Sequence, residues 1–362
     1  MNENSELSPL AKILFVSILI LLVITGLIYF SELLQPIVLA VIFWYIIKAL
    51  ENFIGRLNIK GKQLPKWIRG ALAIAIIFLS LQTAIDIIVT NLSQMVTNFA
   101  IYETSLNQFL NQMGDLFRVE NITDIVKQRI SALDIQSYLQ GILSSLTSFV
   151  GNIFLVIIYV VFIFLEEVSL SKKSKLIFSD PKRIDRMRKL TEQIYRSTNQ
   201  YVTLKTYVSL LTGGFSYIIL LLYGVDYAFL WAFIIFLLNF IPYIGSFIAT
   251  FLPSIFAIVQ FGTIWYFIWI FGSIQVVQLI VGNYIEPRVM GKSLNLSPLV
   301  VVITLSFWGY VWGLLGMFLS VPITSIMLII MAQFPSTRSV AVILSENGEI
   351  DNLIVKDLDE VI

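Results

Sequence analysis

Residues 227–285 read YAFLWAFIIFLLNFIPYIGSFIATFLPSIFAIVQFGTIWYFIWIFGSIQVVQLIVGNYI, a stretch of 59 positions without Asp, Glu, Lys or Arg. A helix that crosses a hydrocarbon layer of ~30 Å needs about 20 apolar residues. The stretch therefore holds at least two passes through a membrane and a folded element between them. A second charge-free run of 45 positions, residues 293–337, follows a short polar segment.

The composition of the whole chain agrees with this interpretation. Of its 362 residues, 57% are hydrophobic and 13% are charged, whereas soluble domains carry about 25% charged residues. The mean hydropathy is +0.86. Backbone groups in lipid must be satisfied internally, so we predict an all-α polytopic membrane protein with seven to eight hydrophobic segments.

The missing residue types exclude several kinds of chemistry. The chain has no Cys and no His, which removes disulfides, thiolate nucleophiles and the commonest metal ligands. We expect no metal site and no cofactor, and no nucleophile–base pair indicates an enzyme. The formal net charge of +1 argues against nucleic acid as a partner.

The distribution of charged and apolar residues divides the chain into six regions. Amphipathic spacing without a long apolar run marks a helical region outside the hydrocarbon layer. The expected regions are three N-terminal transmembrane helices in 1–90, an extracytoplasmic amphipathic helical region in 91–148, a fourth transmembrane helix in 149–165, a basic cytoplasmic helical segment in 166–205, a transport core of transmembrane or re-entrant helices in 206–332, and a polar cytoplasmic tail in 333–362.

Orientation follows from the Lys and Arg residues. They are enriched in 48–69 and 166–205 and are sparse in 91–134. Cytoplasmic loops carry the excess of Lys and Arg. We therefore expect a bacterial cytoplasmic membrane protein with its N-terminus and its tail inside and residues 91–148 outside.

Two segments of the C-terminal half predict broken helices. Asn239, Pro242 and Gly245 interrupt the first charge-free run, and Pro253 and Gly262 follow. Such backbone is tolerated at membrane depth only where protein buries it or it lines a cavity, although a Pro kink packed among helices is the simpler alternative. Residues 298–331 would form one helix ~50 Å long, so we expect a hairpin broken near Gly313, with further hinges at Gly309, Gly316 and Pro322.

Polar residues gather before the second charge-free run. Gln275 and Gln278 lie three positions apart on one helical face, and Asn283 and Glu286 follow. Helices usually end at or before the residue that precedes proline, so Pro287 places Glu286 at a helix C-terminus, where it is the group best suited to titrate. The alternatives are a surface ion pair between Glu286 and Arg288, and glutamines that serve as hydrogen-bonding contacts between helices. Two further acids at apolar edges, Asp86 and Asp226, are interpreted as structural.

Three motifs resemble one known family. They are NFIPYIG at 239–245, GNYIEPRVMGKSL at 282–294 and WGLLGMFLSVP at 312–322, and together they resemble the autoinducer-2 exporter (AI-2E) family of permeases. The resemblance implies a secondary transporter that forms a homo-oligomer, with a pentamer as a candidate size. Some relatives in that family are described as sodium/proton antiporters. Ser246, Asp226 and Ser297 depart from the common family pattern.

We therefore expect a secondary transporter that moves a small solute, such as an autoinducer-2-like signalling molecule, across the bilayer. A monovalent-cation (sodium)/proton antiporter and a non-transporting membrane scaffold that acts through its outer helices are the alternatives. The residues expected to line the substrate or ion pathway are Asn239, Pro242, Gly245, Gln275, Gln278, Asn283 and Glu286. The residues expected to be structural hinges are Pro253, Gly262, Pro287, Gly291, Gly309, Gly313, Gly316 and Pro322.

Overall fold

The computed structural model describes residues 9–56, 64–117, 141, 153–167, 169, 173, 180–290 and 295–355. Within these residues the regular secondary structure is helical, apart from an isolated antiparallel bridge between Leu296 and Ser345, and turns connect the helices. The predicted all-α architecture is confirmed. The helices are α1 (Pro9–Tyr29), α2 (Ser31–Arg56), α3 (Lys66–Thr97), α4 (Phe99–Phe117), α7 (Pro181–Leu222), α8 (Ala228–Leu238), α9 (Ile244–Phe261), α10 (Ile264–Ile280), the π-helical turn η1 (Val281–Ile285), α11 (Glu286–Met290), α12 (Pro298–Gln333) and α13 (Arg338–Leu344).

Six of the described helical segments are long and apolar enough to cross a membrane. Two shorter apolar helical segments, Leu14–Tyr29 and Ala228–Leu238, accompany them. Large apolar side chains along α1, Leu14 and Phe15 among them, are more than half exposed. Water would make such a surface unfavourable, so the chain is a multi-pass membrane protein whose apolar outer faces meet lipid.

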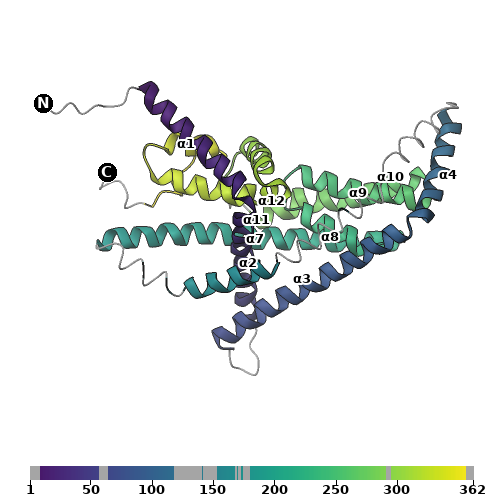
Figure 1. Cartoon of the computed structure of the whole chain (residues 1–362), viewed down its shortest axis with the longest axis horizontal. Coiled ribbons are helices and arrows are strands. Elements are labelled where there is room, and N and C mark those ends of the chain that lie inside the picture. Colours follow the sequence, from purple (N-terminus) through teal and green to yellow (C-terminus); the bar gives the residue numbers. More distant parts are fainter. Residues whose placement is uncertain are drawn as a thin grey trace.

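Helix α7 is the longest element and runs along the long axis of the molecule (Figure 1). It begins where the Asp180 carboxylate accepts a hydrogen bond from the Lys182 N–H, with Pro181 in the first turn, a position that suits proline. Its 42 residues give a length of roughly 63 Å. The helix continues through residue 205, where a boundary between the basic segment and the transport core was expected.

The opposite end of the long axis carries α4. Helix α3 runs on to Thr97, past the expected boundary at residue 90, and α4 follows after Asn98. The Tyr102 hydroxyl on α4 donates a hydrogen bond of 2.9 Å to Asp226 Oδ2, in the turn that leads into α8. The remainder of the predicted amphipathic region, apart from Gly141, lies outside the described residues.

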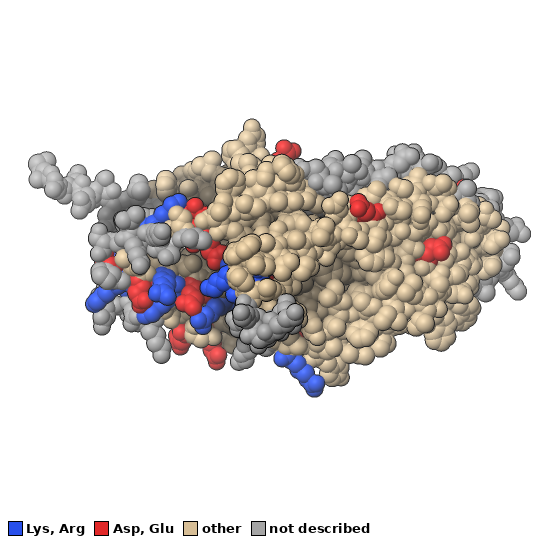
Figure 2. All heavy atoms as spheres, turned by 90° about the horizontal axis from the view of Figure 1, so that it is seen from below, with Lys and Arg blue, Asp and Glu red and all other residues tan. Residues whose placement is uncertain are grey.

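Charged side chains gather at the end of the molecule where α7 begins (Figure 2). The first turns of α7 contain Lys182, Arg183, Arg186, Arg188 and Lys189. Elsewhere the described residues visible in this view include a few isolated acids and one basic side chain at the lower edge (Figure 2). We call this end of the molecule the basic end and the α4 end the distal end.

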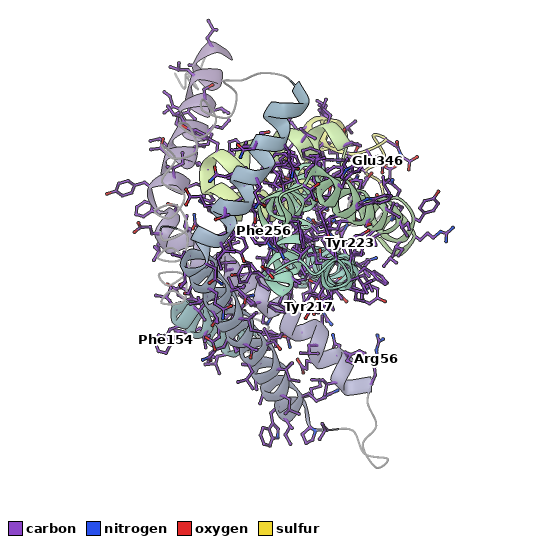
Figure 3. The ribbon with its side chains drawn as sticks, turned by 90° about the vertical axis from the view of Figure 1, so that its right-hand side faces the viewer. Arg56, Phe154, Tyr217, Tyr223, Phe256 and Glu346 are labelled. Carbon is purple, nitrogen blue, oxygen red and sulfur yellow. The ribbon has the colours of Figure 1, made fainter. Side chains whose placement is uncertain are left out.

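Helices α7 to α10 form a compact bundle that contains Tyr217, Tyr223 and Phe256 (Figure 3). Arg56, at the end of α2, and Phe154 lie outside that bundle in the same view. The core of the bundle includes Leu220, Ile235 and Ile274, none of which has any exposed surface. This packing holds the polar residues described below inside the protein.

The break predicted near Gly313 is confirmed. Gly313 has φ 62° and ψ −142°, so α12 consists of two helices joined by a sharp turn. A Cβ at Gly316 would collide with the Trp308 carbonyl oxygen, which shows how closely the two arms approach. The Ser297 N–H donates to the Leu344 carbonyl, 3.0 Å away, so the first arm of α12 begins beside the segment that follows the second arm.

Candidate functional site

The turn between α8 and α9 follows from its sequence. Pro242 lacks an N–H and ends the helical hydrogen bonding, and Tyr243 adopts φ 60°. A Cβ at Gly245 would collide with the Leu238 carbonyl oxygen and lie 2.8 Å from Ile241 Cβ. Glycine at this position therefore allows α9 to fold back against α8.

The other ends of α8 and α9 are held together by one side chain. Gln260 Oε1 accepts from the Asp226 N–H at 2.8 Å, and its Nε2 donates to the Gly224 carbonyl at 2.9 Å. Helix α8 has 11 residues and is roughly 17 Å long, about half of a hydrocarbon layer. The α8–α9 hairpin thus starts and finishes at the distal end, and its turn lies near the middle of the molecule.

Glu286 lies at a different place from the one expected. The helix does not end before Pro287, because α10 passes through the π-helical turn η1 into α11. The Glu286 N–H bonds to the Val281 carbonyl, five residues back. This wider turn accommodates a proline that would break a regular helix. The prediction that a helix ends at Glu286 is therefore wrong, because the helix continues through Pro287 to Met290.

A cavity of about 480 Å³ lies between α7, the α8–α9 turn, α10–η1–α11 and the C-terminal tail. Six of the seven predicted pathway residues line it, together with the predicted hinge Pro287: Asn239, Pro242, Gln275, Gln278, Asn283 and Glu286. Gly245 is buried in the hairpin turn and is not among the lining residues. The structure thus brings pathway residues from two separate segments of the sequence, 239–242 and 275–286, to one chamber.

An ion pair forms part of the cavity wall. Lys205 Nζ lies 2.6 Å from Glu286 Oε1, and the two side chains are 6% and 26% exposed. The pairing with Arg288 that was considered from the sequence is not formed by Glu286. A buried charge is very costly unless it is paired, so the two residues depend on each other.

The amide side chains of the cavity differ in whether their nitrogen and oxygen atoms have hydrogen-bond partners. Asn239 Nδ2 donates to Ser209 Oγ at 3.1 Å. Among the described residues, Gln278 Nε2 and Gln275 Oε1 are buried without a hydrogen-bond partner. Unpaired polar groups of this kind are rare in folded proteins, and here a donor and an acceptor face the same chamber.

Sequence reasoning missed Lys205, Tyr201 and Ser246, which also line the cavity. Lys205 was included at the end of the basic cytoplasmic segment. Its spacing contained a signal, because no charged residue occurs between Arg196 and Lys205 or between Lys205 and Asp226. A single Lys at the start of an apolar helical run is a candidate for an interior charge.

The hinge residues are found at several kinds of position. Gly262 ends α9 with φ 68°, and Pro253 and Pro322 lie inside α9 and α12. Gly309 faces Met317 across the α12 break. Gly291 lies outside the described residues.

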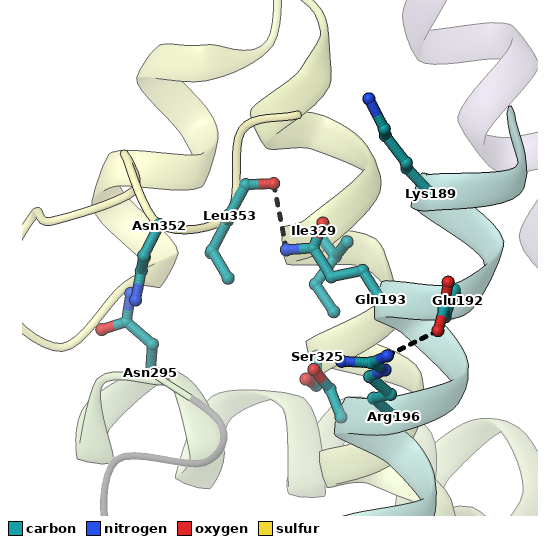
Figure 4. Close-up of a pocket in the computed structure, with 10 residues that line it drawn as sticks. Lys189, Glu192, Gln193, Arg196, Asn295, Ser325, Ile329, Asn352 and Leu353 are labelled. Atoms are coloured by element: carbon teal, nitrogen blue, oxygen red, sulfur yellow. Dashed lines mark hydrogen bonds and ion pairs between the residues drawn. The ribbon is translucent and has the colours of Figure 1, made fainter. Parts of the chain in front are cut away.

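A second cavity of about 410 Å³ opens at the basic end between α7, α12 and the tail (Figure 4). Its Arg196 is paired with Glu192 at 2.6 Å. Gln193 Nε2 donates to the Leu353 carbonyl at 3.1 Å, and the buried Gln333 Nε2 donates to the same oxygen at 2.6 Å. These hydrogen bonds anchor the C-terminal tail at the wall of this second cavity. The same tail carries Glu346, which lines the central cavity.

The described residues contain no group of three or more acids that could hold a metal ion. The central cavity instead combines an ion pair between the buried Lys205 and the half-buried Glu286 with the ends of interrupted helices inside a multi-pass bundle. Ionisable residues at membrane depth mark substrate and ion pathways, and interrupted helices form the binding sites of many transporters. This combination is typical of a membrane transport protein.

The sequences of known proteins also indicate a membrane transport protein. Residues 16–336 match the family described as AI-2E family transporter, and the chain belongs to that family. It is 28% identical to the AI-2 transport protein TqsA of Escherichia coli K12 over 338 residues, 92% of this chain and 96% of TqsA. It is also 28% identical over 337 residues to a Haemophilus influenzae protein named as a candidate transport protein, with 90% and 94% of the two chains covered. YrrI of Bacillus subtilis is 24% identical over 362 residues, 91% of this chain and 98% of YrrI.

Proposed function

We propose that this chain is a secondary transporter that binds its solute in the central cavity. The observation that carries the proposal is the Lys205–Glu286 ion pair on the cavity wall, beside the turn of the α8–α9 hairpin. A structural ion pair alone would not require a chamber around it. The volume of about 480 Å³ falls within the range of roughly 300–1,000 Å³ usual for small-molecule sites.

The first solute to test is autoinducer-2, because the relative TqsA is named as an AI-2 transport protein. The cavity presents amide, hydroxyl and phenol groups from Asn239, Gln278, Ser246 and Tyr201. Such groups suit a small, oxygen-rich solute.

We place the basic end in the cytoplasm and the distal end outside, because Lys and Arg concentrate on the cytoplasmic side of membrane proteins. The cavity then opens toward the cytoplasm past Asn295 and Glu346. On the outer side the contacts of Gln260 hold the hairpin ends together. Transport would alternate between this arrangement and one in which the hairpin side opens.

The absence of Cys from the chain makes a clean test possible. Ser246→Cys places a single thiol on the cavity wall, and Thr191→Cys places one on an exposed position of α7 outside it. Both proteins are reconstituted in proteoliposomes and treated with a charged methanethiosulfonate reagent. We expect the reagent to abolish autoinducer-2 flux in the first variant and leave it unchanged in the second. Unchanged flux through fully modified Ser246→Cys protein would reject the cavity as the pathway.

The cation/proton antiporter, the scaffold and the homo-oligomer stay predictions. The similarity to proteins named as AI-2 transporters favours transport of a solute over the antiporter and the scaffold. Flux in proteoliposomes that contain only this protein separates a transporter from a scaffold.

A further inference from the structure

The N-terminus of α9 faces the central cavity. Pro242, Tyr243 and Ser246 line the chamber, and α9 begins at Ile244. No side chain caps this helix start, and the Ser246 hydroxyl donates instead to the Tyr243 carbonyl. The Ile244 N–H donates to the Pro242 carbonyl, 2.7 Å away, and Gly245 does not line the chamber, which leaves the Ser246 N–H of the first turn. A free N–H at a helix N-terminus, together with the partial positive charge there, favours an anion.

A second donor in the same chamber has no partner. Gln278 is 7% exposed and lines the cavity from α10, the helix packed against α9. Its Nε2 donates to no acceptor among the described residues. Since buried donors are nearly always satisfied, an acceptor atom of a bound solute is the natural partner for this N–H.

The charged and titratable groups around the cavity come from several elements. Helix α7 contributes Lys205 and Tyr201, the hairpin turn contributes Tyr243, and the tail contributes the exposed Glu346. Glu286 is paired with Lys205, and Arg288, two residues further along α11, is not among the lining residues. The buried part of the chamber is therefore neutral when it is empty, with one cation and one anion.

We propose that the solute is a small organic oxyanion, and that its binding is coupled to the uptake of one proton or one monovalent cation at Glu286. The anionic oxygens are bound by the Ser246 N–H at the α9 N-terminus, by Gln278 Nε2 and by Lys205. This inference rests on the proposed function, because it names the class of solute for the same cavity.

Charge balance provides the reason for the coupling. An anion added to the neutral chamber leaves a net negative charge in a medium of low dielectric constant, which is unfavourable. A proton or sodium ion on the Glu286 carboxylate restores neutrality and releases Lys205 Nζ to bind the anion. When the cation is a proton, the carboxylate becomes a carboxylic acid and no other bond changes. The coupling is reciprocal, so the anion binds more tightly when the cation is available.

The test uses three matched pairs of probes with the full chain in lipid nanodiscs: lactate against lactamide, gluconate against sorbitol, and dimethyl phosphate against trimethyl phosphate. Each anion keeps its charge throughout the neutral range, so any pH dependence comes from the protein. We expect at least one anion to bind while its neutral partner does not. Its affinity should rise by up to ~10-fold for each unit by which pH falls, or with added sodium.

Three variants locate the effect. Gln278→Leu removes the side-chain amide whose Nε2 has no partner among the described residues. The protein should therefore fold as well as the wild type and bind the anion about tenfold more weakly. Glu286→Gln should bind the anion without dependence on pH or sodium. Lys205→Met should lose binding, and the Lys205→Met/Glu286→Gln protein, in which no charge is left unpaired, provides the same readout if the single variant does not fold.

The outcomes separate this inference from the proposed function. Neutral probes that bind as well as their anions would overturn the oxyanion class, and anion binding that keeps its pH dependence in Glu286→Gln would overturn the coupling. If no anion binds but the thiol reagent still blocks flux through Ser246→Cys, the inference fails and the proposed function stands. If the reagent leaves that flux intact, the proposed function fails.

Discussion

Lys205 Nζ and Glu286 Oε1 lie 2.6 Å apart and join two helices across 81 positions of sequence. Lys205 comes from the middle of α7, and Glu286 follows the π-helical turn after α10. On the wall of the central cavity, each of the two residues has the other as its nearest group of opposite charge. The pair therefore connects the stability of the bundle to the chemistry of the chamber.

The first prediction concerns the cost of breaking this pair. Lys205→Met leaves the Glu286 carboxylate without its partner and should lower the free energy of unfolding by up to about 5 kcal/mol. Lys205→Met/Glu286→Gln should recover most of that loss, because no charge is then left unpaired. Unfolding in detergent micelles, by heat or by denaturant, of the wild type, Lys205→Met, Glu286→Gln and the double variant provides a double-mutant cycle.

An exposed pair provides the control. Lys173 and Glu166 also lie 2.6 Å apart, but their side chains are 54% and 49% exposed. Lys173→Met should cost less than about 1 kcal/mol. A double variant of the buried pair that is no more stable than Lys205→Met would contradict the account.

The second prediction concerns the α8–α9 turn. Gly245→Ala places a methyl group against the Leu238 carbonyl and Ile241, and overpacking of this kind costs about 1–3 kcal/mol or more. Gly272→Ala in α10 meets nothing within 4 Å and should leave stability unchanged or slightly higher. Thermal unfolding of the two variants measures the difference, and equal stability would mean that the turn is looser than described.

The third prediction concerns the distal end of the hairpin. Gln260→Leu removes both hydrogen bonds that join the end of α9 to residues 224–226. We expect faster amide hydrogen exchange in these segments and a loss of roughly 1–3 kcal/mol. Gln82→Leu, at an exposed position of α3, is the control. Unchanged exchange at Asp226 in Gln260→Leu would show that the hairpin ends are held by other contacts.

The fourth prediction is a pH dependence of stability. The pKa of the Tyr102 phenol is raised above its ordinary value of 10.0, first by burial and then by its hydrogen bonds with Tyr227 and Asp226. The folded state thus holds a proton that the unfolded chain releases. The stabilisation is complete below about pH 10 and is lost as pH rises above that value.

Tyr102→Phe isolates this contribution. The variant should unfold more easily near neutral pH, because it lacks the bonds to Asp226 and Tyr227, and its stability should fall less steeply above about pH 10. Thermal unfolding measured as a function of pH gives both slopes. Identical slopes for the two proteins would exclude Tyr102 as the source.

Much of this architecture can be predicted from local features. Charge-free runs longer than one span require several passes, and Pro242 with Gly245 or the glycines around residue 313 require breaks. Six of the seven pathway residues line one cavity. Polar side chains are unfavourable in contact with lipid, so those in apolar helices face the interior of the bundle.

Other features could not be predicted in this way. The position of Glu286 depends on the π-helical turn, which lets Pro287 remain inside a helix and for which sequence gives no reliable sign. Lys205 looked like the last residue of a solvated basic segment, because its burial arises only when α7 continues unbroken into the bundle. The closure of the hairpin by Gln260 joins residues 34 and 36 positions apart, and such pairings depend on the tertiary arrangement.

The central claim is that the chamber around Lys205 and Glu286 is the pathway of transport. The most direct measurement is autoinducer-2 flux in proteoliposomes that contain Lys205→Met/Glu286→Gln protein, compared with the wild type at equal reconstitution. The account predicts a folded protein of near wild-type stability whose flux is lost, because the pair is required for transport and not for the fold. Flux at the wild-type rate in that variant would contradict it.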